Sequence, residues 1–123
     1  MMEERLLCDS AELVDGGAAV PFDVVFAGQA CRAFAIRYRG QVHAYLNRCA
    51  HVAMEMDWLP DRFFDDSGRW LLCSTHGAVY QPDTGACAGG PCRGGLVKIA
   101  LTEREGVVRW HTGPNLQPVE FPK

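Results

Sequence analysis

Residues 73–80 read CSTHGAVY, so a cysteine stands three positions before a histidine and small or apolar residues follow. An earlier stretch, residues 49–51, reads CAH and pairs the same two residue types. Both stretches come directly after runs with the composition of β-strands, which predicts that each pair lies on a loop at the end of a strand. Loops held by a rigid scaffold are where binding residues are most often found.

Strand signals dominate the rest of the chain. β-branched or aromatic runs occupy residues 5–9, 19–27, 31–38 and 41–47, and the last two are joined by a tight turn at Arg39–Gly40. Residues 61–73 and 96–111 each predict two strands around a turn, at DDSG and REG respectively. Residues 10–13 predict one short turn of helix, and no stretch keeps a helical period over three turns. The pattern predicts an all-β antiparallel barrel or sandwich.

Residues 41–47 show the period of a strand most clearly. Val42, Ala44 and Leu46 alternate with His43 and Tyr45, which predicts one buried face and places His43 at the surface. Two cysteines in other strand runs, Cys8 and Cys31, are expected to fill the core.

Composition limits the classes of function. With 123 residues, 48% of them apolar and 22% charged, the chain fits one folded domain. The net charge of −3 comes from interleaved acids and bases, so no basic stripe is available for nucleic acid. The acidic start is no secretory signal, and no apolar run approaches the roughly 20 residues of a membrane span, so a cytoplasmic location is expected. In a reducing compartment, six cysteines indicate metal binding or redox chemistry.

The four residues Cys49, His51, Cys73 and His76 form a possible ligand set. Two thiolates and two imidazoles suit tetrahedral zinc or an iron–sulfur cluster. Structural zinc loops usually carry two cysteines or two histidines each, whereas here each loop carries one of both. A cysteine nucleophile with a histidine base would need only one such pair. Buried cysteines with unrelated histidines are the remaining alternative.

The complete pattern, C-x-H followed by 21 residues (52–72) and C-x-x-H-G, resembles the signature of Rieske [2Fe–2S] proteins. The following VYQPDTGACAGGP (79–91) resembles the family's aromatic-x-x-x-T-G stretch and the Gly-Pro loop that folds over the cluster. The resemblance spans about residues 5–111. It implies a Rieske-type fold with a small cluster-binding subdomain and one [2Fe–2S] cluster. Cys49 and Cys73 would hold one iron, and His51 and His76 the other.

The same resemblance suggests how the cluster is tuned. Tyr80 matches an aromatic hydroxyl that can donate to a cysteine sulfur, and Gly90 and Pro91 match the cover loop. Ala78 stands where high-potential members carry a serine that donates to a bridging sulfide. Met54 and Thr75 stand where those members carry a pair of disulfide-bonded cysteines. A potential in the lower part of the Rieske range, about −150 to +300 mV, is therefore expected.

The domain is expected to comprise residues 1–112, with cluster-binding loops at about 47–92, and residues 113–123 to form an extended tail. Cys87 and Cys92 are expected to be free or transiently oxidised thiols, because the predicted compartment is reducing.

The resemblance implies a soluble one-electron carrier between a flavoprotein reductase and an oxygenase-type acceptor, rather than a catalyst. The alternatives are a redox-sensing or accessory subunit and, less in keeping with the motif, a zinc-stabilised interaction module. Neither nucleic acid nor a membrane is expected as a partner.

Overall fold

The computed structural model describes residues 4–47, 63–65, 67–72, 78–90 and 95–118. One short 3₁₀ turn, η1 (Ser10–Glu12), is the helical element among these residues. The remaining regular structure is β-strand, as expected. The strands are β1 (Glu4–Asp9), β2 (Val20–Phe26), β3 (Gln29–Tyr38), β4 (Gln41–Leu46), β5 (Leu71–Leu72), β6 (Val79–Tyr80), β7 (Cys87–Gly89), β8 (Lys98–Ile99), β9 (Leu101–Arg104), β10 (Val107–His111) and β11 (Leu116–Pro118).

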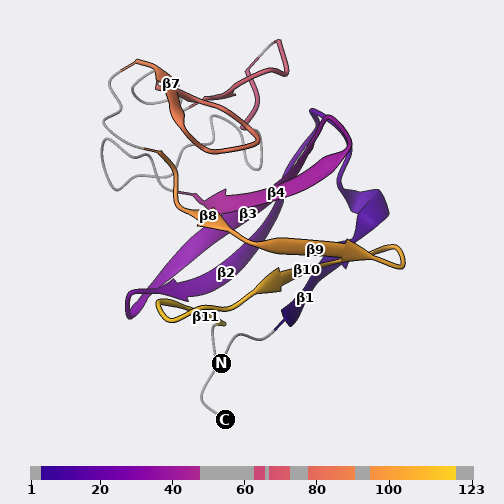
Figure 1. Cartoon of the computed structure of the whole chain (residues 1–123), viewed down its shortest axis with the longest axis vertical. Coiled ribbons are helices and arrows are strands. Elements are labelled where there is room, and N and C mark those ends of the chain that lie inside the picture. The colour runs from indigo at the N-terminus through magenta and orange to yellow at the C-terminus, as the bar shows by residue number, and fades with distance from the viewer. Residues whose placement is uncertain (1–3, 48–62, 66, 73–77, 91–94, 119–123) are drawn as a thin grey trace.

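The strands form three sheets. A five-stranded sheet has the order β11-β2-β3-β4-β8, and a three-stranded sheet has the order β1-β10-β9. The third sheet, β5-β6-β7, is small and lies above the β3–β4 region of the five-stranded sheet in Figure 1. All pairings between these strands are antiparallel. The predicted all-β architecture with a separate small subdomain is confirmed.

The expected hairpins form at two turns in which the second residue is glycine, the residue that adopts a positive φ most readily. Arg39 and Gly40 join β3 to β4 with φ values of 52° and 81°. Glu105 and Gly106, at 54° and 78°, join β9 to β10 in the same way. Two consecutive residues of positive φ give the type of turn whose twist matches that of the flanking strands.

The five-stranded sheet is buried on both faces where β3 and β4 lie. Ala33, Ala35, Ala44 and Leu46 belong to a core shared with the sheet of β1, β9 and β10. Phe34, Ile36 and Tyr45, which alternate with them, belong to a second core shared with the small sheet.

The prediction of one buried face for residues 41–47, with His43 at the surface, is therefore wrong. His43 is only 9% exposed. Alternation separates the two faces of a strand, but it does not reveal that a second layer covers the face carrying the polar residues.

The small sheet is fixed to the five-stranded sheet by aromatic packing. Phe63 stacks on Phe34 with 3.7 Å between ring centroids, and Phe64 stacks on Tyr38. Phe64 also forms an isolated β-bridge with Leu71. The strand pair expected in residues 61–73 is thus reduced, among the described residues, to that bridge and β5.

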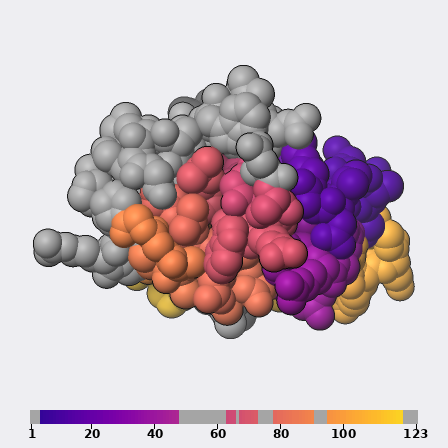
Figure 2. Space-filling view, turned by 90° about the horizontal axis from the view of Figure 1, so that it is seen from above, coloured from indigo at the N-terminus to yellow at the C-terminus, as the bar shows by residue number. Residues whose placement is uncertain are grey.

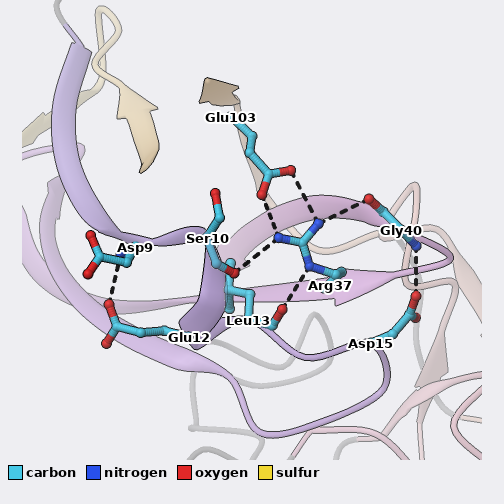
Figure 3. Close-up of polar contacts among 8 residues, drawn as sticks. All are labelled: Asp9, Ser10, Glu12, Leu13, Asp15, Arg37, Gly40 and Glu103. Carbon is cyan, nitrogen blue, oxygen red and sulfur yellow. Dashed lines mark hydrogen bonds and ion pairs between the residues drawn. The ribbon is translucent and has the colours of Figure 1, made fainter. Parts of the chain in front are cut away.

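Arg37 joins the five-stranded sheet to the other layer, as Figure 3 shows. Its guanidinium donates to both carboxylate oxygens of Glu103 and to the carbonyls of Leu13, Ser10 and Gly40. The carboxylate of Asp15 accepts from the backbone amides of Arg39 and Gly40. These contacts hold the segment after β1 against the β3–β4 hairpin.

Residues near the end of the described chain join the sheet. Leu116–Pro118 pair with Phe26, Val25 and Val24 of β2. This pairing does not decide the predicted boundary between residues 112 and 113, which stays a prediction. In the parts of the chain that the structure describes, no helix has the length and apolar character needed to cross a bilayer.

Candidate functional site

Each Cys/His stretch follows a described strand in the sequence. β4 ends at Leu46 and leads toward the first stretch, and β5 ends at Leu72, immediately before the second. Leu72 pairs with Val79 and Leu71 with Tyr80, so residues 73–78 connect two strands of one hairpin. The candidate ligands Cys49, His51, Cys73 and His76, like Pro91, lie outside the described residues.

Two residues next to the second stretch are described, and both are fully buried. Ala78 and Tyr80 have 0% exposure and belong to the core between the small sheet and the five-stranded sheet. Tyr80 pairs with Leu71 on one side and with Cys87 of β7 on the other. The chain that follows residues 73–77 therefore enters a dry core at once, which suits a cofactor whose electrostatics depend on exclusion of water.

The segment that leads to the predicted cover loop contains a disulfide. Cys87 is disulfide-bonded, whereas Cys8 and Cys31 have free thiols. The partner of Cys87 is outside the described residues. Of the two states expected for Cys87, a free or a transiently oxidised thiol, the free thiol is therefore contradicted. The argument from a reducing compartment says nothing about local geometry. Gly90 follows with φ of 82° and an exposed backbone, as a turn into the predicted loop requires.

A contact that the sequence analysis missed joins the small sheet to the five-stranded sheet. The buried Tyr45 hydroxyl donates to the carbonyl of Pro82 at 2.7 Å. Pro82 belongs to the turn Gln81–Ala86 between β6 and β7, which is closed by backbone hydrogen bonds from Gly85 to Gln81 and from Gln81 to Ala86. A clue was present in residues 84–85, the Thr-Gly pair of the family-like stretch, because a glycine in a turn often marks a close approach.

Lys98 and His43 lie beside the same turn. The Lys98 ammonium donates to the carbonyl of Asp83 and lies 3.2 Å from Nδ1 of His43. Because an ammonium can only donate, Nδ1 accepts and the imidazole is neutral. Burial, followed by the nearby charge of Lys98, lowers the pKa of His43 below its ordinary value. Burial also raises the pKa of Tyr45, so its hydroxyl stays protonated and remains a donor.

The described residues show two further polar features. His111 contacts Thr102, and its Nε2 is 3.6 Å from a carboxylate oxygen of Glu4. A groove of about 420 Å³ lies between Tyr38–Arg39, Arg69–Trp70 and Gln81–Asp83. Within the described ranges, no group of three or more His, Cys, Asp or Glu side chains could hold a metal. In the view of Figure 2, the described residues between 63 and 90, pink to orange, form the middle of one face of the molecule.

Comparison with known protein families identifies a match over most of the chain. The model of the Rieske [2Fe-2S] domain matches residues 4–101. That range includes both Cys/His stretches and the residues up to the start of β9. No curated protein sequence matches this chain.

Solved structures share the fold. The chain is similar to the Sphingomonas yanoikuyae B1 ferredoxin, with 22% identity, a TM-score of 0.69, and coverage of 90% of this chain and 100% of that one. A chain in the complex of reduced oxygenase and oxidized ferredoxin of carbazole 1,9a-dioxygenase matches with 22% identity, a TM-score of 0.67, and coverage of 87% and 91%. The terminal oxygenase of carbazole 1,9a-dioxygenase from Novosphingobium sp. KA1 matches with 22% identity and a TM-score of 0.63, over 99% of this chain but 31% of the oxygenase.

Proposed function

This chain belongs to the Rieske [2Fe–2S] domain family, and from that premise we propose that it carries single electrons from a flavoprotein reductase to an oxygenase-type acceptor. The observation that supports this most strongly is the family match over residues 4–101, because that range contains all four candidate ligands. A carrier needs no substrate pocket of its own. It needs a cluster held rigidly near a surface where a partner can dock.

Cys49 and Cys73 are proposed to hold one iron, and His51 and His76 the other. The donor set fits the group, because two thiolates and two neutral imidazoles balance two ferric ions and two sulfides. The described surroundings fit as well. The strand ends at Leu46 and Leu72 lead to the two stretches, and the chain that follows the second enters a dry core at Ala78 and Tyr80.

The cluster, when bound, accepts and releases one electron. The protein residues set how readily this occurs. Burial of Ala78 and Tyr80 keeps water away from one side, and Tyr80 is proposed to donate to a ligand sulfur. Gly90 and Pro91 are proposed to cover the cluster. Without a hydroxyl at position 78, one donor that would favour the reduced state is missing.

The proposed partners follow from the relatives. A ferredoxin and an oxygenase form a complex in the carbazole 1,9a-dioxygenase system, and this chain covers the whole of another ferredoxin of its fold. A cytoplasmic location is also proposed, although the disulfide at Cys87 is unusual for a reducing compartment.

The first test is the content of the purified protein. Iron and acid-labile sulfide are expected in equal amounts, with a red-brown colour and a rhombic electron paramagnetic resonance signal after reduction. Stoichiometric zinc without labile sulfide, after expression with sufficient iron, would contradict the proposal and favour the zinc-stabilised module.

Ligand assignment is tested with matched pairs of variants. His51→Gln and His76→Gln should lose the signal, whereas His111→Gln, a half-buried histidine on β10, should keep it. Cys49→Ser and Cys73→Ser should lose iron, whereas Cys31→Ser should retain it. Loss of iron in the two control variants to the same extent would count against the assignment.

Transfer itself separates a carrier from a sensor. A carrier should be reduced by NADH through a flavoprotein reductase and reoxidised by an oxygenase. Both steps should be at least as fast as one turnover of the oxygenase. Reduction that is far slower than oxygenase turnover would instead support the redox-sensing alternative.

A further inference from the structure

We propose that Tyr45 and Lys98 are positioning residues, which hold the turn Gln81–Ala86 on the five-stranded sheet. They thereby fix residues 87–90, called here the cover segment because they lead into the predicted cover loop of the cluster. This inference rests on the proposed function. The turn connects β6, which follows the second Cys/His stretch, to β7, which leads into Gly90. Its position therefore affects the strand that follows the second Cys/His stretch and the strand that leads toward the predicted cover loop.

Tyr45 supplies the central contact. Its side chain is fully buried, and its hydroxyl donates to the carbonyl of Pro82, itself buried, at 2.7 Å. A buried carbonyl that loses its donor costs free energy, so the bond opposes any movement of the turn away from β4. Tyr45 also packs on Phe34, with 5.9 Å between ring centroids, which helps to fix the position of its ring.

The ring of Tyr45 fits the turn without spare room. Gly85 has φ of +75°, and a Cβ built there would lie 2.6 Å from Cε1 of Tyr45. A Cβ on Gly95 would lie 2.8 Å from the carbonyl oxygen of Gly85. The backbone of the turn therefore lies close to the Tyr45 ring and also close to the segment that enters β8 at Gly95. Both approaches are possible only because residues 85 and 95 are glycines.

Two further bonds come from the β8 side. The Lys98 ammonium donates to the carbonyl of Asp83 and lies 5.6 Å from the centroid of the Tyr45 ring. The amide of Leu96 donates to the carbonyl of Gly85 at 2.8 Å. Three residues of the turn, Pro82, Asp83 and Gly85, thus accept hydrogen bonds from the five-stranded sheet or from the segment that enters it.

The expected effect on the cluster has a direction. The oxidised cluster with its four ligands carries no net charge, and reduction gives it one negative charge. Water stabilises the charged state more than the neutral one, so a looser cover segment should favour reduction. Release of the turn should therefore raise the midpoint potential.

Tyr45→Phe removes the hydroxyl and keeps the ring, and Lys98→Met removes the ammonium. Hydrogen exchange of the holoprotein should be about tenfold faster at the amides of Gln81, Gly85 and Leu96 in Tyr45→Phe, which corresponds to the loss of one net hydrogen bond. Exchange in the β1–β10 pair should be unchanged. The midpoint potential should rise in both variants and most in the double variant.

Tyr38→Phe is the matched control, because Tyr38 is a partly buried tyrosine packed against the same core. It should leave both readouts at their wild-type values. Faster exchange spread evenly over all sheets, or exchange confined to the turn with an unchanged potential, would overturn the positioning role. A shift of the potential without faster exchange at the turn would overturn it too. If the protein binds no cluster, the proposed function fails, and local exchange alone then decides whether Tyr45 holds the turn.

Discussion

Arg37 and Glu103 are 66 residues apart in the sequence and form a two-pronged ion pair, with hydrogen bonds of 3.2 and 2.5 Å. Arg37 lies on β3 and Glu103 on β9, so the pair joins two different sheets (Figure 3). The hydrogen bond to Arg37 lowers the pKa of Glu103, and that to Glu103 raises the pKa of Arg37. The side chains are 16% and 29% exposed, so water screens the pair less than an ordinary surface pair.

Glu103→Gln should lower the free energy of unfolding at pH 7 by about 1–2 kcal/mol, because it weakens a charge-assisted pair. The carboxylate pKa is lowered by folding, so its contribution is present above the ordinary value of 4.5 and is lost as the pH falls through the folded value. The difference between wild type and variant should therefore shrink below about pH 4. Urea unfolding at pH 7 and pH 3.5 measures it. Glu105→Gln, in the exposed turn of the same hairpin, should show little difference at either pH.

His43 should make the protein sensitive to mild acid. Folding lowers the pKa of this histidine, so its contribution to stability is complete above the ordinary value of 6.5 and declines as the pH falls toward the folded value. Burial is the main cause of the lowered pKa, and the positive charge of Lys98, which faces the imidazole, lowers it further. The negative charge of Asp83 favours protonation but offsets only part of these two effects. The free energy of unfolding of the wild type should therefore fall between pH 6.5 and 5, and that of His43→Gln should fall less.

Urea midpoints across this pH range test the idea. His111→Gln is the comparison variant, because His111 lies on β10 in the sheet of β1, β9 and β10. An unchanged slope in His43→Gln would mean that another group dominates the acid sensitivity.

Much of the architecture could be predicted from the sequence, because local signals decide it. Strand composition and the glycine-containing pairs Arg39–Gly40 and Glu105–Gly106 predicted the hairpins, and both pairs have positive φ in the structure. The second layer over β4 could not be predicted, since Tyr45 and His43 look like residues of a solvent face until Phe63 and Leu71 cover it. Contacts between distant segments, such as that of Tyr45 with Pro82, have no local signature.

The site shows the same division. The spacing of Cys49, His51, Cys73 and His76 identified the family, because motif chemistry is local. A free thiol at Cys87, one of its two expected states, is contradicted. The redox state of a compartment describes proteins in general, whereas a disulfide depends on the distance and direction between two particular cysteines.

Cys8 should react much more slowly with alkylating reagents than Cys31. Burial, with the charges of Glu12 and Asp9 next in effect, raises the pKa of Cys8 to about 11. At pH 8 only about 0.1% of such a thiol is thiolate, which is the reactive form. Cys31 is partly exposed on β3. Timed alkylation with iodoacetamide and peptide mass spectrometry should show Cys31 modified first, and the order should reverse only if β1 separates from β10. Equal rates in the native protein would contradict this assignment.

Ala78→Ser should raise the midpoint potential. Ala78 is fully buried next to the second Cys/His stretch, so a hydroxyl placed there must find an acceptor or cost about 1–3 kcal/mol. If the cluster lies where the family resemblance places it, a bridging sulfide is the acceptor, and a donor to sulfide stabilises the added electron.

Ala35→Ser is the matched control, because Ala35 is equally buried but belongs to the other core. That variant should lose stability without a change of potential. Protein-film voltammetry with thermal unfolding of both variants separates the two effects. An unchanged potential in Ala78→Ser, or an equal rise in Ala35→Ser, would show that position 78 does not face the cluster.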